Sequence, residues 1–475
     1  MAKKKEKVGI KVKFCGTNSM EVTGSCTHIC VGETLLLLEC GFYQSCKSVL
    51  SNYRINSRKF DFKAKDIQYV FCLHSHLDHV GLLPLLYKRG FRGRIYIPEM
   101  NFDLLRILLE DCCHICEKDS ELLQRQGYNV EPLYNSDDVK GVLDLCEEIP
   151  FYDKITIDNK VVVRLTHSGH ITNSAHMEMW LTENNHTKKI YYTSDLGNMS
   201  VPTYYVHELE PVNKANLVIA ESTYANPKRQ IKSKDRAKDL EKIRCVIEQT
   251  LDKKGKVLIP VFANHRCQTM LTVLYELFGS DTDWNVPIYV DSPMACKISQ
   301  LMCHIVNENQ MHYWENVMKW KNVHFINEYS DSKMVQDSDV PYIVLASSGM
   351  ISAGRSVSWT QKLLGSEKNH FLFCGFAPEG SIADKIRNST QKYITVDGKA
   401  IPNKAYATSL VSFSSHIQHD TMLEYYSEIN CEKIALVHGN FNDKEKFSKE
   451  LQETIAKKNK TSKEICVNSS TTINL

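Results

Sequence analysis

The chain is expected to be an α/β protein of two domains, and three features of the sequence support this. Its 475 residues exceed the length at which one hydrophobic core usually stops growing. The first part contains short apolar segments separated by turns, a pattern typical of β-strands. From residue 226 onward, apolar segments alternate with helical ones, which predicts a parallel sheet with a crevice at its strand ends.

The expected strands in the first part have alternating or continuous apolar character, and the first three form a meander. They cover residues 8–16, 27–32, 33–41, 67–73, 94–99, 154–159, 161–169, 175–183 and 188–195, and helices are expected at 82–90 and 101–126. The middle part predicts a lysine-rich helix at 235–255 and strands at 256–262, 286–292, 341–349 and 369–376. Two further strands, at 433–440 and 464–470, flank a helix rich in Lys and Glu.

The formal net charge is only +2, so any binding site for a polyanion must be a local feature of the surface. The lysine-rich start has no apolar stretch behind it, and no segment approaches the roughly 20 apolar residues of a membrane span. The 17 cysteines, an odd number, are expected to be reduced thiols. These features predict a cytoplasmic protein that does not enter the membrane.

The segment FCLHSHLDHVG places His74, His76, Asp78 and His79 in the turn between a strand and a helix. Imidazole and carboxylate donors together suit zinc, and two sets of donors this close predict a pair of ions. The alternative is a polar loop that contains several histidines by chance. The apolar strand before the motif and the helix after it favour the metal site.

A pair of metal ions needs further ligands, and three residues stand at comparable strand ends. His170 follows the strand VVVRLTH, Asp195 follows KKIYYTS, and His438 follows KIALV. Taken singly, each is more often a loop residue with no special role. Together with the first motif, they predict one shared site.

The ordered set of motifs resembles the β-CASP nucleases of the metallo-β-lactamase superfamily. It is closest to the bacterial and archaeal RNases related to the endonuclease subunit of the eukaryotic pre-mRNA cleavage factor. The motifs are HSHLDH, SGH, TSDLGN, AESTY, SFSSH and VHG, together with KVLIPVFANHRCQTM, PIYVDSPMA, IVLASSGMISAGR and GFAPEGSIADKI. The resemblance implies a metallo-β-lactamase αββα sandwich formed by residues 1–225 and 406–475, with an α/β β-CASP domain, built on a parallel sheet, inserted at 226–405.

The resemblance also implies a role for each ligand. His74, His76 and His170 would hold one Zn²⁺, and Asp78, His79 and His438 the other. Asp195 would bridge the two ions, and water activated by them would attack phosphorus. Asp78 therefore counts both as a metal ligand and as a catalytic residue.

Two residues match the family's later motifs, Glu221 and His416. His416, oriented by Glu221, is the expected proton donor to the leaving group. A departing ribose 3′-oxygen needs a proton, and a histidine oriented by a carboxylate donates one near neutral pH. The alternative is that Glu221 caps a helix or turn and His416 only packs. A histidine at the position of His438 accompanies RNA-acting members of the family, whereas valine accompanies DNA-acting ones.

The chain departs from the family pattern at three positions. Glu39 replaces the usual aspartate after the long apolar strand LLLL, Ser194 replaces glycine before the bridging aspartate, and Gln418 replaces an aspartate of eukaryotic members. None of these removes a ligand, so activity is still expected.

Two other groups of residues have competing interpretations. Cys112, Cys113, His114 and Cys116 resemble a zinc motif, but His114 would point away from the cysteines on a helix, which favours core thiols. Arg266, Ser348, Gly349 and Arg355 follow β-CASP strands and are predicted to bind RNA phosphates, with ordinary turn chemistry as the alternative.

The leading hypothesis is therefore a zinc-dependent ribonuclease that cuts single-stranded RNA as an endonuclease, with exonuclease activity as a second mode. One alternative is a DNA nuclease or other phosphodiesterase on the same fold. The other is a non-catalytic RNA-binding subunit. A homodimer or an RNA-processing complex is the expected assembly.

Overall fold

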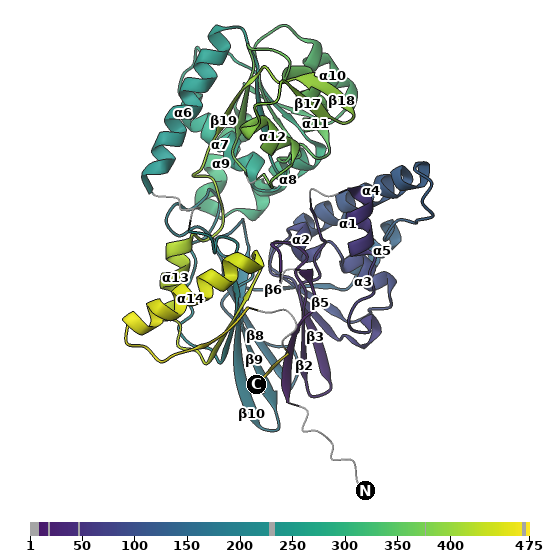
Figure 1. The fold of residues 1–475 in the computed structure, drawn as a ribbon, viewed down its shortest axis with the longest axis vertical. Helices are drawn as coiled ribbons and strands as arrows, with labels where there is room; N and C mark the ends of the chain where they lie inside the picture. Colours follow the sequence, from purple (N-terminus) through teal and green to yellow (C-terminus); the bar gives the residue numbers. More distant parts are fainter. Residues whose placement is uncertain (1–8, 18–19, 46–47, 228–232, 376, 468–471) are drawn as a thin grey trace. The chain divides into compact units, whose positions relative to one another are not determined.

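The computed structural model describes residues 9–17, 20–45, 48–227, 233–375, 377–467 and 472–475, and it divides into two compact units (Figure 1). Unit 1 comprises Met1–Pro202, Val206–Gln230 and Ser415–Leu475, and unit 2 comprises Thr203–Tyr205 and Ile231–Ser414. The chain returns to unit 1 at Ser415 rather than at residue 406. The reason is that the strand Tyr406–Ser409 pairs with His370–Phe373 in the sheet of unit 2.

Unit 1 is built on two seven-stranded sheets. The first has the order β22-β1-β2-β3-β4-β5-β6 and the second the order β21-β20-β11-β10-β9-β8-β7. The strands of the first sheet are β1 (Ile10–Phe14), β2 (Thr27–Val31), β3 (Thr34–Leu38), β4 (Tyr69–Phe71), β5 (Arg94–Pro98), β6 (Cys146–Ile149) and β22 (Ile473–Asn474). Those of the second are β7 (Lys154–Thr156), β8 (Val161–His167), β9 (Ala175–Glu183), β10 (His186–Tyr192), β11 (Leu217–Glu221), β20 (Lys433–Val437) and β21 (Glu464–Cys466).

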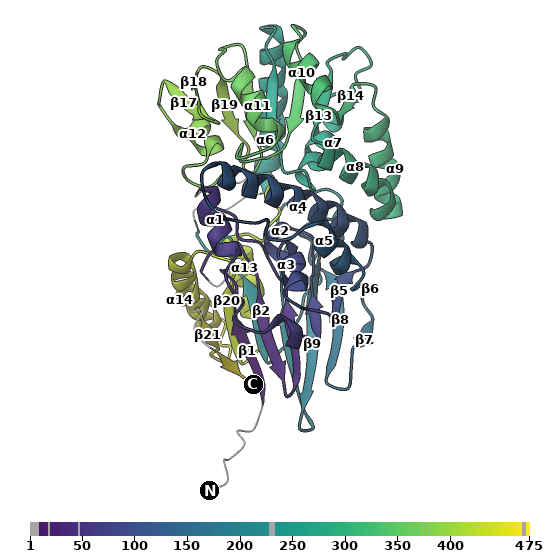
Figure 2. The same cartoon turned by 90° about the vertical axis from the view of Figure 1, so that its right-hand side faces the viewer.

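Helices cover the outer face of each sheet (Figures 1 and 2). They are α1 (Val49–Asn56), the 3₁₀ turn η2 (Ala64–Asp66), α2 (Leu77–Val80), α3 (Leu83–Lys88), α4 (Phe102–Arg125) and α5 (Ser136–Leu143) on the first sheet, and α13 (His419–Glu428) and α14 (Phe441–Lys457) on the second. The inner faces pack on each other through a shared apolar core that includes Leu36, Phe71 and Met177. Unit 1 is therefore an αββα sandwich, as predicted.

The alternating burial of β1 and β2 explains the antiparallel meander that opens unit 1. Every second residue of these strands is buried between the sheets, and the pairing Val12 with Ile29 continues into β3. From β3 to β6 the strands are parallel. In the second sheet β10, β11 and β20 are parallel neighbours. The carboxyl ends of these strands therefore share one edge, where loops can place side chains together.

Unit 2 is an open parallel sheet with helices on both faces, as predicted for the inserted domain. The strand order is β14-β13-β15-β12-β16-β19, and a separate hairpin joins β17 to β18. The strands are β12 (Val257–Pro260), β13 (Ile288–Asp291), β14 (Val323–Ile326), β15 (Ile343–Ala346), β16 (His370–Phe373), β17 (Tyr393–Val396), β18 (Lys399–Pro402) and β19 (Tyr406–Ser409). The helices are α6 (Ser233–Asp252), α7 (Arg266–Phe278), α8 (Pro293–Ile305), α9 (Glu308–Lys319), α10 (Tyr329–Asp337), α11 (Arg355–Leu363) and α12 (Ile382–Asn388).

Within the described ranges, no helix combines the length and the apolar character that a bilayer crossing requires. The expected strand at 464–470 is observed as β21 up to Cys466, and residues 468–470 of that prediction lie outside the described residues.

Candidate metal centre and active site

The seven predicted metal ligands all come from loops or short helices that follow strands of unit 1. β4 leads into His74 and α2, β8 into His170, β10 into Asp195, and β20 into His438. The loops of His170 and Asp195 approach so closely that a Cβ atom on Gly197 would lie 2.1 Å from the carbonyl oxygen of Gly169. The absence of a side chain at this position therefore allows the two loops to meet.

The first group of donors consists of His74, His76, His170 and Asp195. Nδ1 of His76 lies 3.1 Å from Nε2 of His74 and 3.2 Å from Nε2 of His170. Oδ2 of Asp195 lies 3.5 Å from each of the same two Nε2 atoms. Four donor atoms from three separate loops thus converge on one point.

The second group consists of Asp78, His79 and His438, with the other oxygen of Asp195 beside it. Oδ2 of Asp78 lies 3.2 Å from Nε2 of His438 and 3.7 Å from Nε2 of His79. Oδ1 of Asp195 lies 3.4 Å from Nε2 of His79. Asp195 therefore faces both groups, one through each carboxylate oxygen.

The spacing and chemistry of these atoms fit zinc. A tetrahedral zinc ion with bonds of about 2.0–2.1 Å places neighbouring donors about 3.3 Å apart, close to the observed separations. Nε2 of His79 and Oδ1 of Asp195 are buried and have no hydrogen-bond partner among the residues that the structure describes. Buried polar atoms without such partners are costly in a folded protein, so this pair indicates a position for a bound cation.

Four of the histidines are oriented by an oxygen behind the ring. Nδ1 of His74 lies 3.3 Å from Oγ of Ser194, Nδ1 of His170 lies 3.3 Å from the carbonyl oxygen of Ser415, and Nδ1 of His438 lies 2.9 Å from Oγ1 of Thr223. Nδ1 of His79 lies 3.6 Å from Oε1 of Glu39. In His74 and His170 these contacts leave Nε2 toward the donor groups, an arrangement typical of metal-binding histidines. Nδ1 of His438 also lies 3.4 Å from Oδ1 of Asp195.

The electrostatics of the two groups differ. Burial lowers the pKa of His74 and of His170 well below the usual value, and it lowers the pKa of His76 to about 4. These imidazoles are neutral at neutral pH, which is the form that binds metal. Burial would also lower the pKa of His79, but nearby carboxylates, Asp195 first among them, raise it well above its usual value. The second group thus attracts positive charge.

Two departures from the family pattern contact each other directly. The buried carboxylate of Glu39 accepts hydrogen bonds from the hydroxyl of Ser194 at 3.1 Å and from the backbone N–H of Leu73 at 3.3 Å. The longer side chain of Glu39 therefore still reaches the loop that carries His74. The hydroxyl of Ser194 fills the position between Glu39 and the ring of His74.

The predicted acid pair also lies beside the donor groups. Nδ1 of His416 lies 3.3 Å from Oε1 of Glu221, and the His416 ring centroid lies 4.4 Å from that of His170. Glu221 is buried and also accepts the backbone N–H of Leu196 at 2.7 Å. Burial would lower the pKa of His416, but the charge of Glu221 is the largest of the effects that raise it above the usual value. The raised pKa favours the protonated form of this ring, which is the form that a general acid needs.

Sequence reasoning did not identify two residues that support this site. Thr223 contacts Nδ1 of His438, and the amide of Gln418 donates to the carbonyl oxygen of His416 at 2.7 Å. The signal for Thr223 was its place in the AESTY motif, two residues after Glu221. Gln418 was recognised only as a departure from the family pattern, although its side chain binds the backbone of His416.

The four residues predicted to bind RNA phosphates all lie in unit 2. Arg266 is the first residue of α7 and is 9% exposed. The hydroxyl of Ser348 accepts the backbone N–H of Ser352, and a Cβ atom on Gly349 would lie 3.3 Å from the ring of Phe262. The turn after β15 is therefore closely packed within unit 2.

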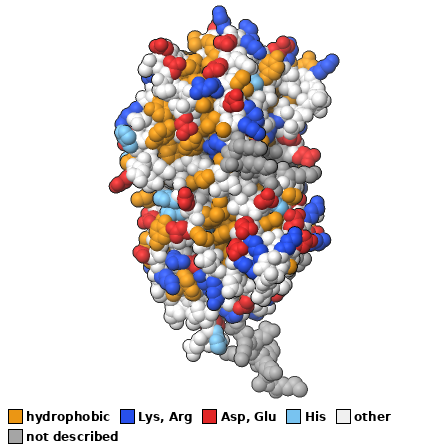
Figure 3. All heavy atoms as spheres, turned by 90° about the vertical axis from the view of Figure 1, so that its left-hand side faces the viewer, with side chains coloured by type: hydrophobic (Ala, Val, Ile, Leu, Met, Phe, Trp, Pro, Cys, Tyr) orange, Lys and Arg blue, Asp and Glu red, His pale blue; other side chains and the backbone are white. Residues whose placement is uncertain are grey.

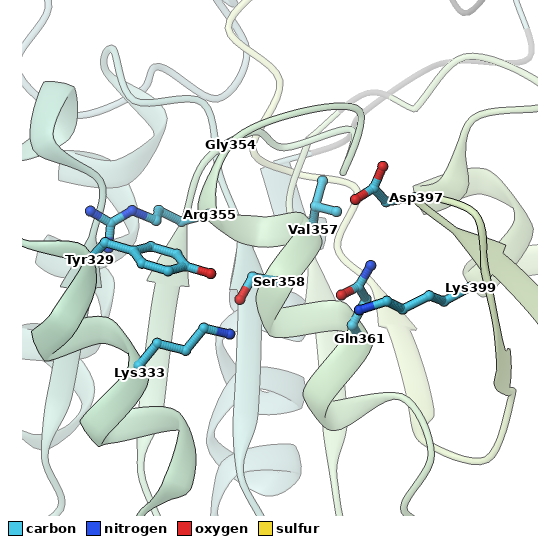
Figure 4. A pocket seen from close by; sticks show the side chains of 9 residues that line it. All are labelled: Tyr329, Lys333, Gly354, Arg355, Val357, Ser358, Gln361, Asp397 and Lys399. Carbon is cyan, nitrogen blue, oxygen red and sulfur yellow. The ribbon is translucent and has the colours of Figure 1, made fainter.

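The side chain of Arg355 is largely committed to contacts within unit 2. Its guanidinium group donates to the buried carboxylate of Asp291 and to the carbonyl oxygens of Asn327 and Glu328. Figure 4 shows it beside the ring of Tyr329 in a pocket of about 350 Å³. These contacts hold the start of α10 against the sheet, so part of the side chain serves the fold.

The cysteine cluster of α4 is part of the apolar core, as predicted. Cys112, Cys113 and Cys116 are buried, whereas the side chain of His114 is 76% exposed and points away from them. The four residues therefore do not converge on one ion.

Comparison with known proteins agrees with the fold and the site. Residues 267–386 match the Beta-Casp domain, and residues 402–462 match the Zn-dependent metallo-hydrolase RNA specificity domain. The chain is 30% identical to Ribonuclease TTHA0252 of Thermus thermophilus over 426 residues, which cover 88% of this chain and 91% of that protein. It is 28% identical to Transcription termination factor FttA of Methanocaldococcus jannaschii over 451 residues, which cover 90% of this chain and 67% of that protein.

A solved structure matches the fold over nearly the whole chain. The crystal structure of a protein of unknown function from Enterococcus faecalis V583 aligns with a TM-score of 0.51 and 10% identity, and the alignment covers 98% of this chain and all of that one. At this identity the likeness concerns the fold alone. The two domain matches and the Thermus relative carry the assignment: the chain belongs to the β-CASP family of nucleases on the metallo-β-lactamase fold and is a metal-dependent hydrolase.

Proposed function

We propose that the chain is a ribonuclease that uses two zinc ions to hydrolyse phosphodiester bonds in single-stranded RNA. It would act as an endonuclease, with exonuclease activity as a second mode. The observation that carries the proposal is the convergence of seven donor side chains around two adjacent points, with Asp195 between them. Bound there, a zinc pair supplies Lewis acidity, which lowers the pKa of water to about 7 and offsets charge on the phosphate.

The residues of the chain then have distinct tasks. His74, His76 and His170 would hold one ion, Asp78, His79 and His438 would hold the other, and Asp195 would be available to both. His416 donates a proton to the departing ribose 3′-oxygen. Its Nδ1 faces Glu221, so we assign the transfer to the other ring nitrogen, Nε2. Glu221 positions this ring and favours its protonated form.

RNA rather than DNA is proposed as the substrate for two reasons. His438 occupies a position at which a histidine accompanies RNA-acting members of the family. One of the two matching family models is described as an RNA specificity domain, and the Thermus relative is named a ribonuclease. Arg266, Ser348, Gly349 and the remaining donors of Arg355 are proposed to contact RNA phosphates from unit 2.

The test compares cleavage and metal content in the same preparations. Zinc-loaded protein is incubated with RNA labelled at either end, with a circular RNA of the same sequence and with the matched DNA strand. We expect the wild type to cut linear and circular RNA, because a circle has no end for an exonuclease. Asp78→Ala is expected to lose cleavage and metal together. His416→Ala is expected to lose cleavage by at least about a hundredfold while keeping its zinc.

His114→Ala is the matched control, because its exposed ring lies outside the site, and it should cut as the wild type does. Retained cleavage by Asp78→Ala would contradict the mechanism. Faster cleavage of DNA than of RNA would show that the chain is a DNA nuclease instead. Wild-type protein that binds no zinc would point to a non-catalytic RNA-binding subunit instead.

We also retain the expectation of a homodimer or of membership in an RNA-processing complex. Light scattering of the purified chain measures its mass directly, and twice the chain mass is the expected result for the homodimer.

A further inference from the structure

The segment that joins α1 to β4 forms a groove that the metal centre does not use. A cavity of about 420 Å³ is lined there by Lys59, Phe60, Phe62, Lys63, Ala64, Lys65 and Arg89. Its volume falls within the range of sites that bind small molecules or parts of larger ones. These seven residues are called the aromatic–basic groove below.

The rings of the groove form a continuous stack. The ring centroids of Phe60 and Phe62 are 5.1 Å apart with planes 7° from parallel, and Phe62 lies 5.5 Å from the ring of His28. At the other end, the guanidinium carbon of Arg89 lies 4.7 Å from the centroid of Phe60. Arg89 is held in this position because it donates to the carbonyl oxygens of Ser57 and Arg58. Phe60 and Phe62 remain partly exposed, so an aromatic ligand can contact the parts of these rings that the stack leaves uncovered.

The groove concentrates positive charge that the whole chain does not have. Residues 58–66 and 88–92 together contain seven Lys and Arg residues against two carboxylates, a local net charge of +5, whereas the entire chain has +2. In the part of the chain with described placement, Lys59, Lys63 and Lys65 are exposed and take part in no ion pair, and Asp61 is paired with Lys13 at 3.4 Å. By contrast, positive and negative side chains are mixed on the face shown in Figure 3. The lysines are therefore available to an anionic ligand.

Stacked rings flanked by cations match the chemistry of single-stranded nucleic acid. Bases stack on aromatic side chains irrespective of sequence, and lysines neutralise the phosphates between them. An acidic peptide would satisfy the lysines but would make no use of the exposed parts of the two phenylalanine rings. The combination therefore favours a polyanion that carries flat aromatic groups.

We propose that the aromatic–basic groove is a second binding surface for single-stranded RNA, in addition to the metal centre. The proposal rests on the proposed ribonuclease function, because it assigns the groove to a part of the same RNA that is not being cut. The groove lies before β4 and the ligand His74 lies after it, at the opposite edge of the first sheet. Gln68 and His74 are six residue steps apart, which corresponds to roughly 20 Å of extended chain around β4, so only an RNA of several nucleotides can reach both sites.

The test measures RNA binding without cleavage, in full-length Asp78→Asn protein. The probe is a fluorescent RNA of about 20 nucleotides, longer than the roughly 4–16 nucleotides that a single-stranded site occupies. Lys59→Ser/Lys63→Ser/Lys65→Ser should weaken binding. It should also reduce the slope of log affinity against log salt by about 2, because each phosphate contact contributes about 0.7. Phe60→Leu should weaken binding roughly tenfold with the slope unchanged, because it removes a stacking ring and no charge.

The matched control is Lys446→Ser/Lys449→Ser/Lys457→Ser on α14, which removes the same charge from exposed lysines outside the groove. It should bind RNA as the parent does, and thermal unfolding followed by circular dichroism should show that every variant is folded. Equal losses of RNA affinity in the two triple variants, or unchanged affinity in Phe60→Leu, would contradict the proposal that the groove binds RNA. The proposal would also be contradicted if poly-glutamate, added at the same total charge as the RNA, displaced the RNA from the groove. Each of these results leaves wild-type cleavage unaffected, so failure of the groove is distinguishable from failure of the ribonuclease.

Discussion

At Asp195 the two carboxylate oxygens face different donor groups, and the residue before it explains how the chain keeps this geometry. Ser194 has φ 46°, a left-handed conformation that glycine adopts without strain and serine does not. Its hydroxyl donates to Glu39 and contacts Nδ1 of His74. We infer that Glu39 and Ser194 act as a pair, in which the longer acid and the added hydroxyl together orient the ligand loop.

The charge of Glu221 should set the pH at which His416 loses its proton. In the Glu221→Gln variant the pKa of His416 is expected to fall, because the largest effect that raises it is removed. A general acid must be protonated, so the alkaline side of the pH profile of kcat should move to lower pH. Kinetics on RNA across the pH range measure this shift, and zinc content should stay at the wild-type level. An alkaline limb at its original pH would contradict the role of Glu221.

The same pair has a consequence for stability. The folded pKa of His416 is raised above its usual value of 6.5, so the pair stabilises the fold fully below that value. This stabilisation is lost as the pH rises through the raised folded pKa.

Among the secondary-structure elements, the strands that carry ligands are parallel neighbours whose carboxyl ends meet at one edge. The helix α14, which follows the loop of His438, contributes an unusual buried cation. Lys444 has no exposed surface, and its ammonium group donates to the carbonyl oxygen of Leu436 in β20. Burial lowers the pKa of Lys444 to about 8. The buried charge therefore destabilises the packing of α14 at neutral pH.

Lys444→Met should stabilise unit 1 at neutral pH, by roughly 1–3 kcal/mol, because a buried charge is replaced by an apolar chain of similar length. The folded pKa lies below the unfolded value of about 10.5. The wild type therefore gains stability as the pH rises from about 8 toward 10.5, and the difference from the variant should shrink. Urea unfolding at neutral pH and near pH 10 measures both values.

Lys446→Met is the control on the same helix, because Lys446 is exposed and should show no such gain. A variant that is less stable than the wild type at neutral pH would show that Lys444 makes a contact worth more than its burial costs.

On the scale of the whole molecule, the two units have separate apolar cores and different dependence on metal. The core of the sandwich lies between its two sheets, whereas two other cores cover the two faces of the parallel sheet in unit 2. All the proposed ligands belong to unit 1. Metal binding is therefore expected to stabilise unit 1 and to leave unit 2 unchanged.

Removal of zinc with a chelator should lower the melting temperature of unit 1 alone. A ligand at a hundred times its Kd stabilises the folded state by about 2.7 kcal/mol per site, which corresponds to a shift of roughly 5 °C or more. Of the five tryptophans only Trp180 lies in unit 1, so tryptophan fluorescence reports mainly on unit 2. Circular dichroism should therefore show a transition that moves with zinc, and fluorescence one that does not. Equal shifts in both signals would contradict a metal site confined to unit 1.

Much of the site could be predicted because its signals are local. HSHLDH is contiguous, and His170, Asp195 and His438 each follow a recognisable apolar strand. The strand β6 and the hairpin β17–β18 were not identified, because such short strands carry little pattern. The strand β11 was also missed, although its residues are all buried and begin with the apolar run LVIA. The boundary at 405 was placed too early because β19 has a polar sequence and is recognised only by its partner β16.

Periodicity in the sequence predicted two α/β domains with a parallel sheet in the second, and the contiguous motifs predicted the donor residues, because both signals depend on neighbours along the chain. The αββα sandwich and the insertion of the second domain were predicted only through the resemblance that these motifs have to a known family. Packing between distant segments decided the rest: which nitrogen of each histidine faces the donors, how Glu39 reaches the loop of His74, and why Arg355 turns inward. The stack of His28, Phe62, Phe60 and Arg89 was also decided by packing between distant segments. Its members come from three separate segments, and contacts across such distances follow from the geometry of the folded core, which no local pattern encodes.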